Sequence, residues 1–466
     1  MTKFSGETNK SPKDIVIIGG VAAGTSAASK AKRIDPDANV TIIQQESIVS
    51  YGSCGLPYVL EGLIDDFSEL IARPAEEFQI KYDIDILLNT RALKILPSKK
   101  QIIVRDGVSK NKEANRIMDY DSLVIATGAG AIIPPLQGME NINSGIFTLR
   151  TLSDGIAIKR FLENKHPNSC IVVGAGLIGV EIIEAFKKKG LEVTLVGSGN
   201  SILPKIIDPE MSLVVEQELE NNGIKLILGE RVEKILGNQN FQGVVTNKGK
   251  TILSDFLVFG TGVKPNSEIA SDAGIKLGIN NAIKVDRYMQ TNISNIFAAG
   301  DCATAENYVT GKDTYLPLGT TANKQGRVAG ENSAGGKAIF RGIAGSAITK
   351  TFGLFIGKTG LSTEEARKNG FDPVETSINS ITRAGYYPDS KSISIKIVAD
   401  KKTEQILGAQ IIGGEGVKGR IDVVALALLK KATINDLSSY DACYVPPISP
   451  VWEPMNIVAS NLSKSV

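Results

Sequence analysis

The sequence is short of histidine, cysteine and net charge, and each shortage excludes a class of protein. Its only histidine, His166, lies in a Pro-Asn loop and is interpreted as a surface residue, so the usual general base is missing. Four widely spaced cysteines form no disulfide framework and no CxxC metal motif, which favours a reducing cytoplasm and a protein without a metal. The net charge of +2 gives no electrostatic case for binding nucleic acid.

Long apolar runs are also lacking. The longer apolar stretches are broken by glycine, proline or glutamate before they reach the length of a membrane span. The polar segment Met1–Asp14 has no apolar core of the kind found in signal peptides. We therefore expect a cytoplasmic protein that acts on a small molecule, with no nucleic-acid or membrane partner. The 466 residues suffice for about three domains.

Two βαβ patterns are the clearest features that the sequence does contain. Each has a buried parallel strand, a glycine turn, a helix and a second strand, as in dinucleotide-binding units. The first has its strands at Ile15–Ile18 and Val40–Ile43 and its helix at Ala22–Arg33. The second has its strands at Cys170–Val173 and Leu191–Val196, with a helix between them. Two such units in one chain predict two bound dinucleotides.

The second glycine turn fits G-x-G-x-x-G completely. Gly174, Gly176 and Gly179 follow a strand and open a helix, so they allow a tight turn and a close approach of backbone N–H groups to a pyrophosphate. The first turn, Gly19–Gly24, has Val21 in place of the middle glycine. A cysteine shortly after the first turn suggests a flavin there, which leaves the second turn for a nicotinamide dinucleotide.

The acid that normally follows the second strand of such a unit is absent from both. Gln44 stands at that place after the first unit and can still hydrogen-bond a ribose hydroxyl. Gly197 stands there after the second unit, with no arginine immediately beside it. Neither NADH nor NADPH is therefore excluded as the co-substrate.

Cys54 is the strongest candidate for a reactive group. It has no partner cysteine at short spacing, so a lone thiol would have to form a mixed disulfide, a persulfide or a sulfenic acid with something from outside. Gly55 and Pro57 predict that a helix starts just after Cys54. Because a thiol at a helix N-terminus has a lowered pKa, we expect a lowered pKa for Cys54. The other three cysteines, Cys170, Cys302 and Cys443, are interpreted as structural.

Beyond about Gly335 the pattern of buried parallel strands and glycine loops ends. Ile393–Val398 alternates like a half-exposed antiparallel strand, and a second strand and a helix follow. We expect an α/β protein with two Rossmann-like dinucleotide-binding domains, one inserted in the other, and a C-terminal α+β dimerisation domain. The predicted FAD-binding domain spans residues 12–128 and 270–335, the NAD(P)-binding domain 129–269, and the dimerisation domain 336–466.

The chain resembles the pyridine-nucleotide flavoprotein disulfide reductases in five segments, which are Gly19–Gly24, Ser50–Tyr58, Ala126–Gly128, Gly174–Gly179 and Thr291–Asp301. The resemblance covers nearly the whole chain and is closest to the single-cysteine branch, which includes coenzyme A (CoA)-disulfide reductase, polysulfide or persulfide reductase and NADH oxidase. It implies one FAD per chain and a homodimer. In that family the C-terminal domain of one subunit completes the active site of the other.

The resemblance also implies roles for individual residues. Cys54 would be the nucleophile that forms a mixed disulfide with CoA, while Tyr386 and Tyr444, supplied by the partner subunit, would replace the missing histidine. The positions implied for FAD are Gly19, Gly20, Val21, Ala22, Ala23, Gly24, Gln44, Ala92, Thr127, Gly128, Gly300 and Asp301. Those for NAD(P) are Gly174, Gly176, Leu177, Ile178, Gly179, Glu181 and Gly262. Those for CoA are Ser26, Lys30, Arg33, Ser50, Ser53, Asn323 and Trp452.

The expected activity is reduction of CoA disulfide, or of a related CoA persulfide or polysulfide, by NAD(P)H through FAD and one cysteine. An NADH oxidase that reduces O2 is the nearest alternative. A redox-sensing flavoprotein without turnover is the alternative from another class, and the presence of both a nicotinamide loop and a reactive thiol argues against it. Peroxidase and classical oxidase members of that family carry a histidine inside the first glycine loop, whereas positions 21 to 23 here are Val-Ala-Ala, which argues against a peroxidase.

Overall fold

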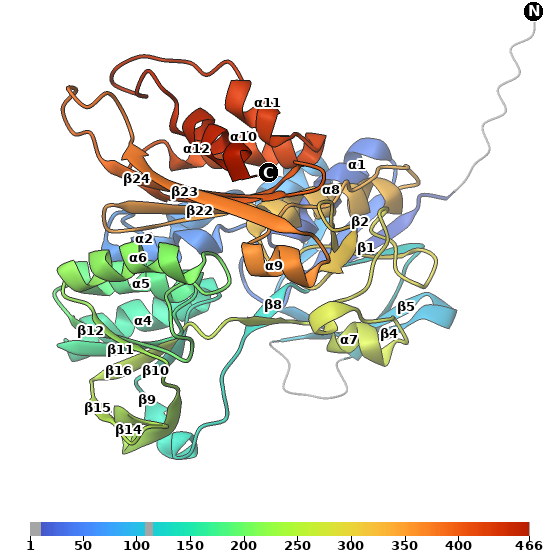
Figure 1. Ribbon diagram of the computed structural model, residues 1–466. Helices are drawn as coiled ribbons and strands as arrows, with labels where there is room; N and C mark the ends of the chain where they lie inside the picture. Colours follow the sequence, from blue (N-terminus) through green and yellow to red (C-terminus); the bar gives the residue numbers. More distant parts are fainter. Residues whose placement is uncertain (1–10, 108–114, 466) are drawn as a thin grey trace, which may run out of the picture.

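The computed structural model describes residues 11–107 and 115–465 (Figure 1). Most of the polar segment Met1–Asp14 lies outside these residues. No helix in the described ranges is both long enough and apolar enough to cross a membrane.

Apolar residues of the first βαβ pattern build a parallel five-stranded sheet in the order β18-β7-β1-β2-β3. β1 is completely enclosed by its neighbours, since Ile15 pairs with Val40 on one side and Ser122 on the other. The bounds are β18 Ile296–Ala298, β7 Ser122–Ile125, β1 Asp14–Ile18, β2 Asn39–Ile43 and β3 Ile84–Leu87. The chain therefore returns to this sheet at β18, after the second βαβ unit.

Small residues bring two helices of the first unit into close contact. α1 (Ala22–Ile34) packs on α8 (Gly319–Ser333), which comes from the far end of the chain. A Cβ atom on Gly326 would lie 2.3 Å from the carbonyl oxygen of Ala23, and one on Gly330 would lie 2.1 Å from that of Ala27. Only glycine fits at both positions, so the backbones of α1 and α8 lie almost against each other.

The second βαβ pattern builds another parallel sheet, in the order β10-β16-β11-β12-β13. Phe186 of α5 and Phe256 of β16 meet edge to face in its core, with ring centroids 5.3 Å apart. The strands are β10 Ile146–Thr148, β16 Phe256–Phe259, β11 Ser169–Val173, β12 Glu192–Gly197 and β13 Lys225–Leu228. Its helices are α4 Leu152–Lys165, α5 Leu177–Lys188 and α6 Pro209–Asn221.

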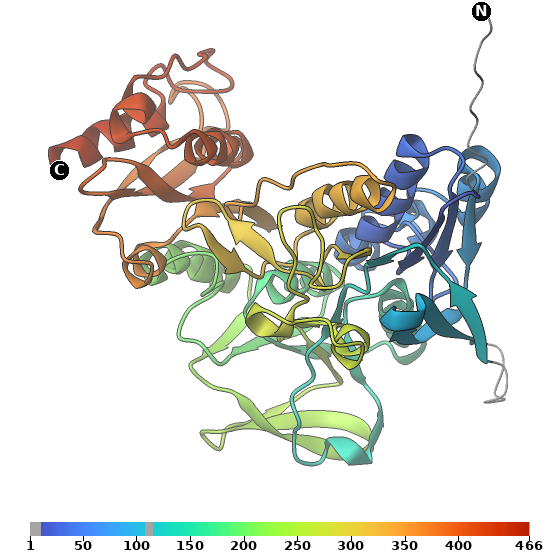
Figure 2. The same ribbon diagram turned by 90° about the vertical axis from the view of Figure 1, so that its right-hand side faces the viewer.

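The C-terminal unit is an antiparallel five-stranded sheet with helices on one face, which confirms the expected fold class. Its order is β21-β22-β25-β24-β23. The strands are β21 Ala347–Thr351, β22 Leu354–Gly360, β25 Ile406–Gly413, β24 Ser392–Asp400 and β23 Pro373–Ile381. The helices are α10 Val417–Lys430, α11 Ile434–Ser439 and α12 Pro454–Leu462. Figure 2 shows this unit (orange to red) on the opposite side of the molecule from the N-terminal part of the first unit (blue).

The expectation of a half-exposed strand at Ile393–Val398 is wrong. Seven of the nine residues of β24 are buried, because the sheet is covered on both faces. In Figure 1 helices α10 and α12 lie above the sheet, and α6 of the second unit lies below it. Lys396, a polar residue of the alternating pattern, therefore faces another part of the same chain rather than water.

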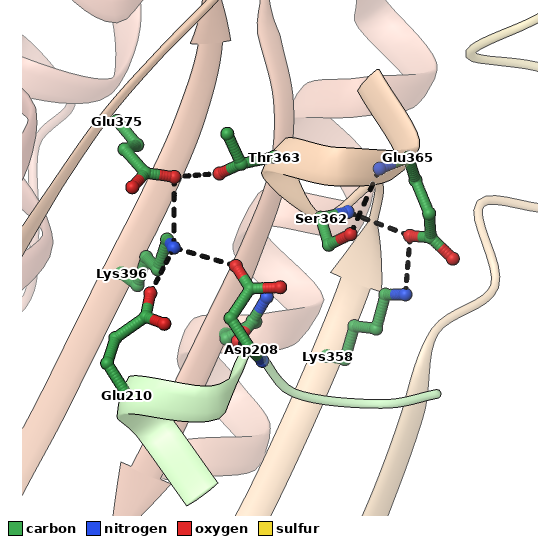
Figure 3. Close-up of polar contacts among 9 residues, drawn as sticks. Asp208, Glu210, Lys358, Ser362, Thr363, Glu365, Glu375 and Lys396 are labelled. Atoms are coloured by element: carbon green, nitrogen blue, oxygen red, sulfur yellow. Dashed lines mark hydrogen bonds and ion pairs between the residues drawn. The ribbon is translucent and has the colours of Figure 1, made fainter. Parts of the chain in front are cut away.

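Lys396 of β24 forms ion pairs on the face of the C-terminal sheet that contacts α6 (Figure 3). Its side chain is only 4% exposed, and its Nζ lies 2.7 Å from Asp208 Oδ2 and 2.9 Å from Glu375 Oε2. Glu210, in the first turn of α6, is the third carboxylate around the same ammonium group. Gln410 of β25 accepts a hydrogen bond from the backbone N–H of Asp208 at 2.7 Å. This cluster joins the second unit to the C-terminal sheet.

The chain crosses between the first two units at a small two-stranded sheet. There β8 (Ala129–Ala131) pairs with β17 (Val263–Pro265), and both strands lie just inside the predicted NAD(P)-binding domain, residues 129–269. These domain limits stay a prediction. The remaining strands are β4 Thr90–Leu96, β5 Gln101–Asp106, β6 Asn115–Asp119, β9 Ile142–Ser144, β14 Val232–Thr246, β15 Thr251–Leu253, β19 Ala305–Asn307 and β20 Lys312–Thr314. The remaining helices are α2 Leu56–Glu61, α3 Ala75–Tyr82, α7 Glu268–Asp272 and α9 Thr363–Lys368.

Candidate active site

A cavity of about 390 Å³ lies beside the first glycine loop. Its walls come from the ends of β1, β2 and β7, where ligands of parallel sheets bind. The predicted site residues that line it are Gly19, Gly20, Val21, Gln44, Ser53, Ala92, Thr127 and Gly128.

The first loop has the geometry that a pyrophosphate needs. Gly19 has a φ of +105°, and a Cβ atom there would lie 2.1 Å from the carbonyl oxygen of Ala126. A Cβ atom on Gly24 would lie 1.8 Å from the carbonyl oxygen of Gly19, so the helix passes directly over the loop. Val21 caps α1 without a side-chain hydrogen bond, and the first turn holds no acid. The backbone N–H groups of that turn therefore remain available to an anion, which fits a dinucleotide.

Gln44 has a different role from the ribose contact that the sequence suggested. Its Oε1 accepts a hydrogen bond from the N–H of Gly20 at 2.8 Å, and its Nε2 donates to Glu46 and to the carbonyl oxygen of Ile48. Both amide hydrogens are therefore used to hold the loop. Glu46 lines the same cavity, and burial raises its pKa although Tyr51 donates a hydrogen bond to it. Glu46 thus places a carboxylate in the wall of the cavity at this end.

Arg150 is a cavity residue that the sequence analysis missed. Its Nη2 lies 2.6 Å from Asp301 Oδ2, and its Nε donates to the carbonyl oxygen of Ala129 at 3.0 Å. Burial raises the pKa of Asp301, and Arg150 opposes that rise. The position of Arg150 is fixed by Asp154, which accepts hydrogen bonds from the backbone N–H groups of Arg150 and Thr151. The only sequence signal was the Thr151–Asp154 capping box at the start of α4.

Cys54 lies in a short 3₁₀ turn, Ser53–Gly55, that leads into α2, and it is exposed. The expected lowering of its pKa is wrong. Partial burial is the largest cause of a raised pKa, and the carboxylates of Glu181 and Asp301 raise it further, while Arg150 opposes them. Of the other thiols, Cys170 and Cys302 are buried as expected, whereas Cys443 is exposed in the single chain.

The second glycine loop repeats the geometry of the first. A Cβ atom on Gly174 would lie 2.3 Å from the carbonyl oxygen of Gly260, and one on Gly179 would lie 1.9 Å from that of Gly174. A Cβ atom on Gly176 would meet nothing within 4 Å, so the middle of the loop is open to a phosphate. A Cβ atom on Gly197 would lie 3.0 Å from that of Ala175, which leaves little room for the acid that is absent there.

The positions implied for CoA lie in part on the α1–α8 surface. Ser26 donates a hydrogen bond to Asn323 at 2.7 Å, which confirms only that the two lie together. Lys30 is paired with Glu331 of α8 at 2.8 Å, so a phosphate would have to compete with that carboxylate. Trp452 is 74% exposed and lies in the C-terminal unit.

Tyr386 and Tyr444 come from two separate segments of the C-terminal unit, yet their hydroxyls are 3.3 Å apart. Both rings are strongly exposed, at 77% and 46%. The hydrogen bond to Tyr386 is the main cause that raises the pKa of Tyr444. The neighbouring Tyr387 is less exposed and takes no part in this pair.

Known proteins resemble both the dinucleotide-binding region and the C-terminal unit of this chain. The family described as pyridine nucleotide-disulphide oxidoreductase matches residues 13–326, and the dimerisation domain of that family matches residues 346–455. An NADH oxidase of Methanocaldococcus jannaschii is 38% identical over 97% of this chain and 99% of its own length. A coenzyme A disulfide reductase of Staphylococcus haemolyticus is 29% identical over 96% of this chain and 98% of its own.

A solved structure extends the likeness to the whole fold. An NAD-dependent persulfide reductase from A. fulgidus superposes with a TM-score of 0.93 at 37% identity, over 97% of this chain and 83% of that one. The two parallel-sheet units and the C-terminal sheet are thus parts of one known architecture. This chain belongs to the pyridine nucleotide-disulphide oxidoreductase family.

Proposed function

We propose that this enzyme binds one FAD at the first glycine loop and NAD(P)H at the second, and reduces CoA disulfide or a CoA persulfide or polysulfide through Cys54. The observation that carries the proposal is the place of Cys54. It is an exposed thiol between the FAD cavity, which its neighbour Ser53 lines, and the helix α5 that follows the second loop. The four free cysteines suit a reducing cytoplasm.

The residues of the chain supply binding, orientation and a nucleophile. When bound, FAD would carry two electrons from NAD(P)H to the disulfide. The Cys54 thiolate attacks one sulfur of CoA disulfide, forms a mixed disulfide and releases one CoA thiolate. Reduction of the mixed disulfide releases the second CoA and restores Cys54. Overall, NAD(P)H and one proton convert one disulfide to two thiols.

Protonation of the departing thiolate falls to the Tyr386–Tyr444 pair in this proposal. The homodimer would bring the pair of one subunit to Cys54 of the other, which accounts for the exposure of two hydrogen-bonded phenols in the single chain. Ser26, Lys30, Arg33 and Asn323 would hold CoA along α1 and α8, where cations suit its phosphates.

O2 is the second candidate oxidant, and the NADH oxidase from Methanocaldococcus jannaschii favours it. Mass spectrometry of the purified native enzyme separates the two. We expect a CoA adduct on Cys54, removed by NADH, and faster NADH consumption with CoA disulfide than with air-saturated buffer. An enzyme without the adduct that consumes NADH only with O2 would be an oxidase. An enzyme whose FAD is reduced slowly and that turns over neither oxidant would be a sensor.

Both nicotinamide dinucleotides should support turnover. Gly197 leaves no carboxylate to favour NADH, and residues 198–204 contain no arginine to favour NADPH. We expect the kcat/KM values for NADH and NADPH to lie within about a thousandfold of each other, which corresponds to roughly 4 kcal/mol. Steady-state kinetics with each co-substrate measures this ratio. A larger ratio would require a contact to the adenosine ribose that this assignment lacks.

A further inference from the structure

Strand β21 of the C-terminal unit is hydrogen-bonded to α5, the helix that follows the second glycine loop. Thr349 of β21 donates a hydrogen bond to Glu181 Oε1 at 2.7 Å, and Thr351 donates to the carbonyl oxygen of Val180 at 3.3 Å. One turn further along α5, Glu184 accepts from Lys350 at 3.0 Å. Thr349 is only 5% exposed, so its hydroxyl has little access to water.

The same face of α5 lies against the segment that carries the thiol. At one end, Lys188 of α5 lies 2.5 Å from Glu61, the last residue of α2, and a Cβ atom on Gly62 would lie 3.2 Å from Lys189 Nζ. Cys54 lies seven residues before Glu61, and Glu181 lies seven residues before Lys188. Cys54 lies in the 3₁₀ turn just before α2, and α2 packs against α5. If the two segments run back from the Glu61–Lys188 pair in the same direction, Glu181 comes near Cys54.

The charges on these groups agree with that placement. Burial raises the pKa of Glu181, and the hydrogen bond from Thr349 opposes the rise. Burial is the largest cause of the raised pKa values of Cys54 and of Tyr58, which lies one turn along α2. The charge of the Glu181 carboxylate is the next largest cause at both residues. Arg150 and Asp301 also act on Cys54.

We propose that Thr349 is a positioning residue of the active site, whose hydroxyl keeps the Glu181 carboxylate ionised and directed at Cys54. The C-terminal unit thereby places a negative charge beside the thiol and favours the protonated form of Cys54 between turnovers. This assignment rests on the proposed function only in taking Cys54 as the reacting thiol.

The pH dependence of Cys54 alkylation tests the proposal in the reduced holoenzyme, with Cys443→Ser as background so that the other exposed thiol does not react. Below the pKa of Cys54 the logarithm of the iodoacetamide rate rises linearly with pH. Near the pKa of Glu181 the logarithm of the rate should rise less steeply with pH, which gives a flat segment in the profile. The reason is that the new negative charge on Glu181 disfavours the thiolate of Cys54. Glu181→Gln should remove the flat segment and speed alkylation at pH 8 about threefold or more.

Thr349→Val, which keeps the shape but removes the hydroxyl, should move the flat segment to higher pH by about one unit. That shift corresponds to the loss of a hydrogen bond to a charged group. Thr349→Ser should restore the wild-type profile, and Thr349→Ala replaces the valine variant if that variant folds poorly. In the Glu181→Gln background, Thr349→Val should change nothing further.

Two results would overturn the proposal. One is a wild-type profile in Glu181→Gln, which would mean that the carboxylate does not act on the thiol. The other is a Thr349→Val shift that persists in the Glu181→Gln background. Failure to reduce CoA disulfide would count against the proposed function alone, since alkylation does not depend on the oxidant.

Discussion

Cys54→Ser is expected to abolish the reduction of CoA disulfide while the FAD content and the reduction of FAD by NAD(P)H persist. A serine hydroxyl at neutral pH cannot attack a disulfide, because the nucleophile in this exchange is the thiolate. The substitution is nearly isosteric, and Cys54 is exposed rather than part of the core. Stopped-flow reduction of FAD and steady-state turnover of CoA disulfide measure the two halves of the reaction separately.

Cys443→Ser is the matched control for this variant, because Cys443 is the other exposed thiol. It should reduce CoA disulfide at the wild-type rate. Consumption of O2 by Cys54→Ser can continue, since reduced FAD can still react with oxygen. Turnover of CoA disulfide by Cys54→Ser at the wild-type rate would show that the single-thiol mechanism is wrong.

Lys396→Met is expected to destabilise the protein by removing the cation at the contact between the second unit and the C-terminal sheet. The methionine keeps most of the volume but leaves Asp208, Glu210 and Glu375 facing one another without their cation. Removal of one partner from a buried ion pair costs about 3–5 kcal/mol. Glu210 and Glu375 are 53% and 40% exposed and can turn toward water, so the lower end of that range applies. Differential scanning calorimetry should show Tm lowered by about 3 °C, because the unfolding entropy of a chain of this length makes each kcal/mol worth about 1 °C.

Lys358→Met provides the comparison, because Lys358 is also nearly buried but has a single carboxylate partner, Glu365, at 2.7 Å (Figure 3). Its Tm should fall by clearly less. If both variants melt at the same temperature, the three-carboxylate cluster adds nothing beyond an ordinary ion pair. Faster proteolytic cleavage within α6 or β24 in Lys396→Met would show that the lost stability lies at the contact between the second unit and the C-terminal sheet.

Local patterns in the sequence were enough to predict the fold class and the type of cofactor site. The alternation of buried strands with glycine turns is set by residues close together in the chain, and it gave β1, α1 and β2 to within one residue at each end. The two glycine loops fold as expected because Gly19 and Gly174 need a positive φ that other residues avoid. The lone thiol could be recognised for the same reason, since its isolation is a property of the sequence.

Side-chain partners from distant segments were decided only by the tertiary structure. Arg150 reaches Asp301 across 151 positions and Thr349 reaches Glu181 across 168, and no spacing rule connects such pairs. Burial likewise depends on what covers a strand or a thiol after folding. For that reason the sequence alone predicted a half-exposed β24 and a lowered pKa for Cys54. In the folded chain β24 is buried, and the pKa of Cys54 is raised first by partial burial and then by the carboxylates of Glu181 and Asp301.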